Sequence, residues 1–135
     1  MVGDPNFWRG KRVLLTGHTG FKGGWLALWL TSMGAKVNGY ALDAKIMPNF
    51  FNETNLRERL TSSVIGDIKN FSTLKDAMSL AKPSIVINMA AQPLVRKSYE
   101  EPVETFKTNI FGTINLLEAA RKIDTVEAIV NVTTD

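Results

Sequence analysis

The feature that most constrains this chain of 135 residues is an apolar run that leads into three glycines at a spacing of three. Residues 13–16 have the composition of a short buried strand, and Gly17, Gly20 and Gly23 follow at the start of an apolar helix. Bare backbone at a helix N-terminus presents unpaired N–H groups and a partial positive charge, which attract phosphate. In this context the triplet predicts a dinucleotide-binding unit, and the alternative is a glycine-rich turn without a ligand.

The composition limits the classes of fold and partner. A length of 135 residues suits a single core, and an apolar share of 44% with a charged share of 21% is typical of globular proteins. The net charge of +3 is small and the basic residues are dispersed, so we expect no nucleic-acid partner. Cysteine is absent, which excludes disulfides and thiolate metal sites, and we predict no metal site. The apolar run near 25–30 is too short to cross a bilayer, so we expect a cytoplasmic protein without a membrane partner.

Further apolar runs alternate with helical patterns along the chain. Strands are expected at 13–16, 37–42, 63–65, 84–88 and 128–132, and helices at 21–33, 71–80 and 102–122. The remaining segments are expected to be irregular, apart from a short helix that begins near Glu53. The alternation predicts a Rossmann-type doubly wound α/β fold with a parallel sheet in the order 3-2-1-4-5. We expect residues 1–135 to be the N-terminal portion of one NAD(P)-binding Rossmann domain, with no second domain.

Two of the predicted helices carry apolar residues whose placement can be anticipated. Trp25 and Trp29 are expected to lie in the core rather than to serve as ligand platforms. The helix at 102–122 combines an apolar stripe with a charged face that is expected to point outward. The stripe consists of Val103, Phe106, Ile110, Ile114 and Leu117, and the charged face of Glu104, Lys107, Glu118 and Lys122.

Two aspartates follow predicted strands at the edge of the sheet where ligands bind. The carboxylate of Asp43 can accept both hydroxyls of an adenosine ribose and repels a 2′-phosphate, which favours NAD over NADP. Lys45 lies close in the sequence and leaves this preference open. Asp67 can accept a hydrogen bond from the adenine amino group, with Ile68 against the ring. Both aspartates also fit a role in a solvated turn.

Other residues near this edge are weaker candidates for cofactor contacts. Ala90 and Ala91 are small enough to let a dinucleotide pass closely, and Gln92 can reach substrate or pyrophosphate. Asn109 lies within an apolar helix and needs partners, so a structural clasp is supported as well as a cofactor contact. His18 is the sole histidine, and we expect it to position the turn rather than to act in acid–base chemistry.

The end of the fifth predicted strand carries the candidates for chemistry. The hydroxyl of Thr134 would lie beside a nicotinamide ring and could donate a hydrogen bond to a reacting oxygen, and Asp135 could act as an acid. Neither Tyr40 nor Tyr99 is followed by lysine at the fourth position. The hydroxyl therefore lacks the basic partner that a complete site needs.

In this order the motifs resemble the extended short-chain dehydrogenase/reductase superfamily, whose members act on nucleotide sugars. The matching pieces are Thr-Gly-x-x-Gly-Phe-x-Gly at 16–23, Asp43, Gly66-Asp67-Ile68, Ala90-Ala91-Gln92, Ser-Tyr-x-x-Pro at 98–102, Asn-x-x-Gly-Thr at 109–113 and Thr-Thr-Asp at 133–135. The resemblance covers about residues 10–135. Within the superfamily, segments 17–26, 39–43 and 90–96 resemble the CDP-glucose 4,6-dehydratases.

The resemblance implies bound NAD and the conversion of CDP-glucose to CDP-4-keto-6-deoxyglucose, with hydride removed from C4′ and returned to C6. It implies that Thr134 contacts the C4′ oxygen, that Asp135 assists water loss, and that the full-length enzyme is a homo-oligomer. The implied cofactor-binding residues are Gly17, His18, Thr19, Gly20, Phe21, Lys22, Gly23, Asp43, Asp67, Ile68, Ala90, Ala91, Gln92 and Asn109.

The chain departs from the family pattern in one large respect. The Tyr-x-x-x-Lys pair of the family, the later strands and the nucleotide-sugar domain would lie beyond residue 135. We therefore expect an N-terminal portion of a longer enzyme that lacks dehydratase activity when made alone. Two alternatives stay open: a nucleotide-sugar 4-epimerase or reductase of the same superfamily, and a non-catalytic dinucleotide-binding or sensor protein.

Overall fold

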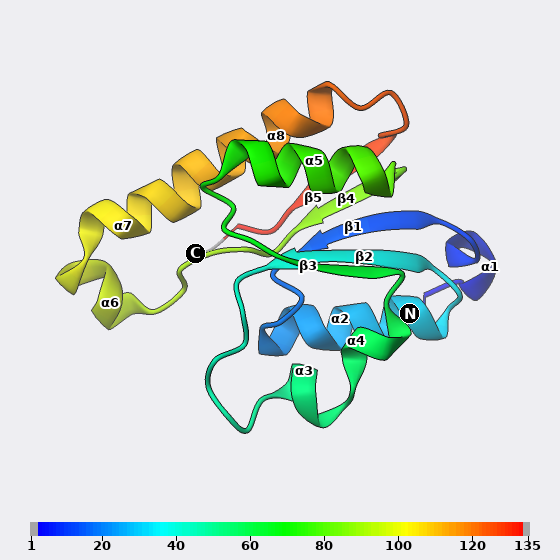
Figure 1. Cartoon of the computed structure of the whole chain (residues 1–135), viewed down its shortest axis with the longest axis horizontal. Coiled ribbons are helices and arrows are strands. Elements are labelled where there is room, and N and C mark those ends of the chain that lie inside the picture. The colour runs from blue at the N-terminus through cyan, green and yellow to red at the C-terminus, as the bar shows by residue number, and fades with distance from the viewer. Residues whose placement is uncertain (1–2, 134–135) are drawn as a thin grey trace.

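A computed structural model describes residues 3–133 as a five-stranded parallel sheet with helices on both faces (Figure 1). The strands are β1 (Arg12–Thr16), β2 (Lys36–Ala41), β3 (Ser62–Ile65), β4 (Ile85–Asn88) and β5 (Ala128–Asn131). Their order is β3-β2-β1-β4-β5, and every neighbouring pair is parallel. The predicted fold class and strand order are confirmed.

The helices form two layers around this sheet (Figure 1). One layer contains α2 (Phe21–Ser32), α3 (Phe50–Glu53) and α4 (Leu56–Arg59), and the other contains α5 (Phe71–Ala81) and α8 (Gly112–Arg121). The remaining helices are α1 (Pro5–Trp8), α6 (Val95–Glu100), α7 (Pro102–Phe106) and the π-helical turn η1 (Lys107–Phe111). Among residues 3–133, no helix has the length and apolar character needed to span a bilayer.

Side chains of β1 alternate between the two layers, as the geometry of a strand requires. Val13 and Leu15 pack with Leu30 of α2, whereas Leu14 packs with Leu74 of α5 and Leu116 of α8. Each of these six side chains is at most 1% exposed. The central strand is therefore covered on both faces, which explains its continuous apolar sequence.

Four short helices, α1, α3, α4 and α6, lie in segments that the sequence pattern predicts to be irregular or places differently. Asp4 caps α1 by accepting a hydrogen bond from the Asn6 amide at 2.9 Å. Asn49 caps α3 in the same way through the Asn52 amide, so this helix begins at Phe50 and not near Glu53. The helix α6 also replaces a segment expected to be irregular. Helices of one or two turns are too short to show a clear apolar period, which is why the pattern misses them.

The prediction for the helix at 102–122 is wrong about which face of the helix packs against the core. The apolar stripe is exposed, by 47% at Ile110 and 45% at Leu117, while Leu116, Ala119 and Ala120 are buried. The cause is a close contact at Gly112, where an added Cβ would lie 2.6 Å from Ile68 Cγ2. This contact and the two alanines let the helix lie close to the sheet layer, so the larger apolar side chains point away.

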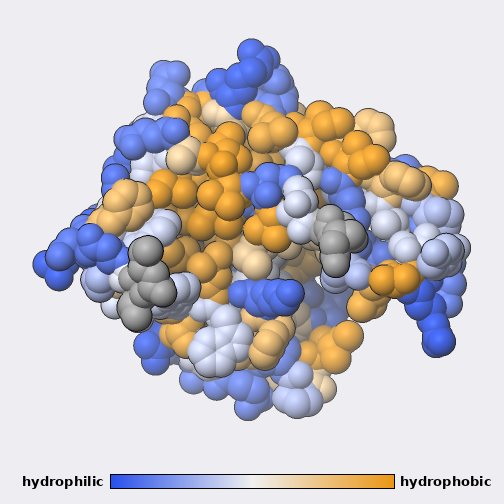
Figure 2. Space-filling view, turned by 180° about the vertical axis from the view of Figure 1, so that it is seen from behind, coloured by the Kyte–Doolittle hydropathy of each residue, from blue (hydrophilic) through white to orange (hydrophobic). Residues whose placement is uncertain are grey.

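The predicted burial of the tryptophans is also wrong. Trp25 is 53% exposed and Trp29 is 48% exposed, because the buried positions of α2 are occupied by Gly23, Gly24, Ala27 and Leu30. Ile129 of β5 is 39% exposed as well. Figure 2 shows a broad apolar area on the back of the molecule.

Replacement of two neighbouring leucines tests this orientation of α8. We expect Leu116→Ala, at a fully buried position, to lower the free energy of unfolding by about 2–5 kcal/mol through loss of burial and creation of a cavity. Leu117→Ala is the matched control and should cost less than about 1 kcal/mol, because its side chain is 45% exposed. Urea unfolding measures both values. Equal losses, or a larger loss at Leu117, would contradict the orientation.

Candidate functional site

The glycine turn joins β1 to α2 and leaves the start of the helix without a cap. Gly17 has a φ of +80°, and its amide donates to the Tyr40 carbonyl at 2.9 Å. Gly20 is the N-cap residue and has no side chain to accept a hydrogen bond. Because the Gly24 amide donates to Gly20 at 2.8 Å, the amides of 21–23 precede the first bond of the helix and have no acceptor within it. Such a helix start is suited to bind an anion.

Two of the three glycines are required by close contacts within the turn. A Cβ at Gly23 would overlap the Gly17 carbonyl oxygen, and a Cβ at Gly17 would lie 2.9 Å from the Met89 carbonyl oxygen. A Cβ at Gly20 would meet only the Gly17 oxygen, at 3.3 Å, and otherwise open space. The backbone at Gly20 is therefore accessible from outside.

Thr16, the last residue of β1, connects this turn to two other strands. Its hydroxyl donates to Asn88 Oδ1 at 2.5 Å and accepts from the amide of Met89 at 3.1 Å and that of Ala90 at 3.2 Å. Asn88 in turn donates to Asn131 Oδ1 at 2.7 Å. The network fixes the carboxyl ends of β1, β4 and β5 relative to one another. The apolar periodicity of the sequence does not predict this network, although a polar residue at the end of each of these apolar strands was a usable signal.

The side chain of His18 points into the protein and is fully buried. Its Nε2 lies 2.8 Å from Ser63 Oγ, and its ring packs edge-on against Phe51. Gly39 makes room for the ring, because a Cβ there would lie 2.5 Å from it. His18 therefore anchors the glycine turn to β2 and β3 through its buried side chain.

Burial lowers the pKa of His18 to about 4, since the charged imidazolium is poorly solvated there. The backbone of Tyr40 opposes this shift but makes no hydrogen bond of regular geometry with the ring. Within residues 3–133, Nδ1 has no hydrogen-bond partner. The histidine is neutral near pH 7, which fits a positioning role.

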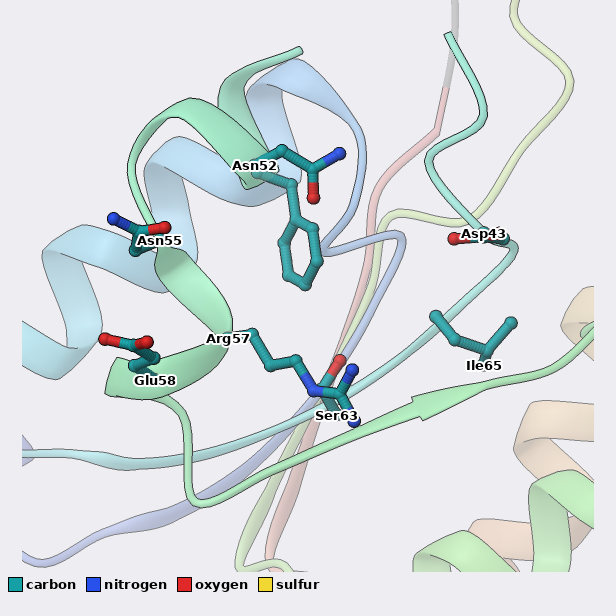
Figure 3. A pocket seen from close by; sticks show the side chains of 8 residues that line it. Asp43, Asn52, Asn55, Arg57, Glu58, Ser63 and Ile65 are labelled. Atoms are coloured by element: carbon teal, nitrogen blue, oxygen red, sulfur yellow. The ribbon is translucent and has the colours of Figure 1, made fainter. Parts of the chain in front are cut away.

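Asp43 follows β2 and lies beside the glycine turn in space. The hydroxyl of Thr19 donates to the Leu42 carbonyl at 2.8 Å, which ties the turn to the end of β2. The side chain of Asp43 lines an open pocket of about 300 Å³ between β3 and the short helices α3 and α4 (Figure 3). The carboxylate of Asp43 therefore lies at the edge of the sheet beside the glycine turn.

The predicted adenine contacts differ in how accessible they are. Asp67 accepts from the amide of Lys69 at 2.8 Å, and its side chain is 39% exposed. The Lys69 ammonium lies 2.7 Å from the Glu104 carboxylate, and this contact raises the pKa of Lys69. Ile68 is only 5% exposed because it packs against Gly112. Asp67 thus presents a carboxylate edge to solvent, whereas most of Ile68 lies in the core.

Asn109 forms a clasp with the loop that follows β4. Its Oδ1 accepts from the Gln92 amide at 2.8 Å, and its Nδ2 donates to the Gln92 carbonyl at 3.3 Å. The side-chain amide of Gln92 donates to Thr105 Oγ1 at 3.1 Å. Asn109 lies within η1, and π-helical turns often occur at functional sites. Both side chains are therefore engaged in holding the loop that carries Ala90 and Ala91.

The other predicted residues are placed as follows. Phe21 and Lys22 are exposed on the first turn of α2, while Ala90 is half-buried and Ala91 exposed in the loop after β4. Thr134 and Asp135 lie outside the described residues. Within the part of the chain that the structure describes, no cluster of three potential metal ligands is present.

The strand order and the uncapped glycine turn define a Rossmann-type α/β protein. The chain belongs to the GDP-mannose 4,6 dehydratase family, whose family model matches residues 14–135.

Similar proteins and structures agree with this family. The chain is 55% identical over 132 residues to CDP-glucose 4,6-dehydratase from Salmonella typhimurium, a match that covers 98% of this chain and 36% of the relative. Pal from Bacillus thuringiensis has a similar structure, with a TM-score of 0.79 and 25% identity over 90% of this chain and 38% of that one. UDP-glucose 4-epimerase from Brucella ovis in complex with NAD gives a TM-score of 0.76 and 27% identity over 90% and 35%. The chain spans little more than a third of the length of these proteins.

The buried His18 predicts a specific loss of stability in acid. Its pKa is about 4 in the folded protein and near 6.5 when unfolded, so below pH 6.5 the unfolded chain binds a proton that the folded protein does not. Stability is therefore full above pH 6.5, falls as the pH drops, and is lower by about 3 kcal/mol at pH 4.

Urea unfolding at a series of pH values measures this effect against a His18→Gln variant, which keeps a polar side chain but cannot titrate. The difference in unfolding free energy between the two proteins should change by about 3 kcal/mol between pH 7 and pH 4. Parallel pH profiles would show that His18 is not held neutral by burial.

Proposed function

We propose that this chain is the NAD-binding portion of a nucleotide-sugar 4,6-dehydratase that acts on CDP-glucose. The observation that carries the proposal is the uncapped glycine turn at 17–23, found in a chain 55% identical to a CDP-glucose 4,6-dehydratase over 98% of its length. NAD, when bound, supplies a hydride acceptor that is regenerated within each turnover. The chain's own residues bind and orient the cofactor and part of the substrate.

The glycine turn binds the pyrophosphate. The amides of Phe21, Lys22 and Gly23 have no acceptor within the helix and donate to the phosphate oxygens. Gly20 lets the phosphates approach the backbone, because its surroundings are open apart from the Gly17 oxygen. The positive end of the α2 dipole adds to the attraction.

Asp43 and Asp67 hold the adenosine end. The Asp43 carboxylate lines an open pocket next to the turn and accepts hydrogen bonds from the ribose hydroxyls. The exposed edge of the Asp67 side chain accepts from the adenine amino group. Gln92 and Asn109 hold the loop after β4, so that Ala90 and Ala91 leave room for the dinucleotide.

The reactive end follows β5. We assign to Thr134 a hydrogen bond to the sugar C4′ oxygen, which orients the hydroxyl that is oxidised. Asp135 gives a proton to the C6 hydroxyl, which leaves as water; the C5 proton passes to a base supplied by the rest of the enzyme, and the electron pair of the C5–H bond forms the C5=C6 double bond. The Thr16–Asn88–Asn131 network supports these roles, because it fixes β5 against the strand that carries the glycine turn.

A second candidate function is that of a nucleotide-sugar 4-epimerase. It is favoured by the similarity to the NAD-bound UDP-glucose 4-epimerase, with a TM-score of 0.76. Both functions require the same cofactor site and differ in the product, because an epimerase inverts C4′ and loses no water.

A chimera tests the proposed reaction. Residues 1–135 replace the matching segment of the Salmonella typhimurium enzyme, to which 132 residues align. We expect NAD-dependent formation of a 4-keto-6-deoxy sugar from CDP-glucose, measured by mass spectrometry of the product. Thr134→Val in the chimera should lower kcat by about a hundredfold, because a hydrogen bond to the reacting oxygen is lost.

Two glycine variants of the chimera separate cofactor binding from chemistry. Gly20→Ala places a methyl group in the open phosphate site and should raise the NAD concentration needed for half-maximal rate by about tenfold. Gly3→Ala is the matched control, because its Cβ would meet only the flexible ends of Met33 and Trp29, the nearest at 3.2 Å. A folded chimera that binds NAD but yields no product, or a product inverted at C4′, would overturn the proposed reaction.

A further inference from the structure

Two carboxylates compete for one ammonium group beyond the end of β3. The Lys69 ammonium lies 2.7 Å from Glu104 Oε2 of α7 and 3.6 Å from Asp67 Oδ2. The shorter contact is a charge-assisted hydrogen bond, and the longer one exceeds hydrogen-bond distance. The three side chains are between 32% and 46% exposed, so a ligand in solution can reach them. The ammonium group is therefore bound to Glu104 and stands off from Asp67.

The backbone that carries Asp67 and Lys69 is fixed by two other elements. The Tyr40 hydroxyl of β2 donates to the Asp67 carbonyl at 2.9 Å, and the Asn115 side-chain amide of α8 donates to the Lys69 carbonyl at 3.0 Å. The lysine stem is flexible, whereas its main chain is held at both ends of the turn. The ammonium group can therefore swing between Glu104 and Asp67 without a change in the backbone.

The two oxygens of the Asp67 carboxylate differ in what they leave for a ligand. Oδ1 accepts from the Lys69 backbone amide at 2.8 Å, which orients the carboxylate. Among residues 3–133, Oδ2 accepts no hydrogen bond and has the Lys69 ammonium as a charged neighbour at 3.6 Å. An oxygen in this state accepts from an amino group and repels a carbonyl oxygen. Movement of the ammonium onto Oδ2 would occupy this acceptor and favour a carbonyl instead.

Glu104 is held between two lysines, one on each carboxylate oxygen. The Lys69 ammonium contacts Oε2, and the Lys107 ammonium lies 3.4 Å from Oε1. The hydrogen bond from Lys69 is the main cause that lowers the pKa of Glu104, and the same hydrogen bond raises the pKa of Lys69. Both groups are therefore charged at neutral pH. Loss of the Glu104 charge would leave Asp67 as the carboxylate nearest to the Lys69 ammonium.

We propose that Glu104 is a positioning residue for purine recognition, because it holds the Lys69 ammonium away from Asp67 Oδ2 and keeps that oxygen free to accept from an amino group at C6 of a purine. The charge of Glu104 thus sets how strongly the site prefers a 6-aminopurine to a 6-oxopurine. This inference rests on the proposed function, in which the Asp67 carboxylate accepts from the adenine amino group. It assigns a role to Glu104 and Lys69, which the proposed function does not use.

Titration with two dinucleotides by isothermal calorimetry at low ionic strength tests the inference. NAD carries an amino group at C6 of its purine, and nicotinamide hypoxanthine dinucleotide carries a carbonyl there. We expect the protein to bind NAD about tenfold more tightly, since one hydrogen bond to a carboxylate is replaced by repulsion. Glu104→Gln should lower this ratio to about threefold, a modest change because exposed ion pairs are weak.

A double-mutant cycle shows whether Glu104 acts through Lys69. Lys69→Met removes the ammonium group and should keep the preference for NAD at about tenfold or more. In that background Glu104→Gln should leave the ratio unchanged, because no ammonium remains to be moved. Glu101→Gln is the matched control: it removes the same charge at the start of α7, from an exposed carboxylate that pairs with Lys97 at 3.7 Å. It should leave the ratio at the wild-type value.

Three results would overturn the inference and leave the proposed function intact, since NAD still binds in each. They are equal binding of the two dinucleotides, an unchanged ratio in Glu104→Gln, and a Glu104→Gln effect that persists in the Lys69→Met background. Binding of neither dinucleotide would overturn both the inference and the proposed function.

Discussion

The contact between Gly23 and the Gly17 carbonyl is the constraint on which the rest of the site depends. With no Cβ at Gly23, α2 begins directly against the end of β1, so its first-turn amides face the edge where the strands end. A larger residue would push the helix away and move those amides from the sheet. Within the same turn, the His18 side chain points into the protein, and its Nε2 lies 2.8 Å from Ser63 Oγ of β3. The uncapped start of α2 and the packing of the central strands thus share one structural origin.

Hydrogen bonds between side chains and loops hold the remaining parts of the site to this turn. Thr16 joins the end of β1 to Asn88 and to the two amides that follow β4, and Asn88 extends the connection to Asn131 of β5. Asn109 holds the loop after β4 from the opposite side. Loops gather at this edge because all five strands are parallel. The glycine turn and the loop after β4 are therefore both held by side-chain hydrogen bonds at one edge of the sheet.

Local sequence patterns predict much of the fold, and the predictions that are wrong concern features that long-range contacts determine. The apolar runs of β1 and β4 are specified by nearby residues, and both strands are confirmed, as is the predicted sheet order. The orientation of α8 depends on Gly112 meeting Ile68, which is distant in sequence, and periodicity alone selects the wrong face. The inward direction of His18 likewise depends on Gly39 in another strand. Asp43 was predicted as a ribose contact from its position after an apolar strand, whereas the pocket that its side chain lines is formed only in the folded chain.

The central claim is that a dinucleotide binds with its pyrophosphate on the first turn of α2. Two-dimensional NMR of the ¹⁵N-labelled protein during titration with NAD tests it most directly, because each backbone amide reports its own environment. The account predicts that the largest shifts occur at the amides of Gly20 to Gly23, with smaller ones near Asp43. Shifts that leave this turn unchanged and concentrate elsewhere, for example around Trp29 on the apolar face, would contradict it.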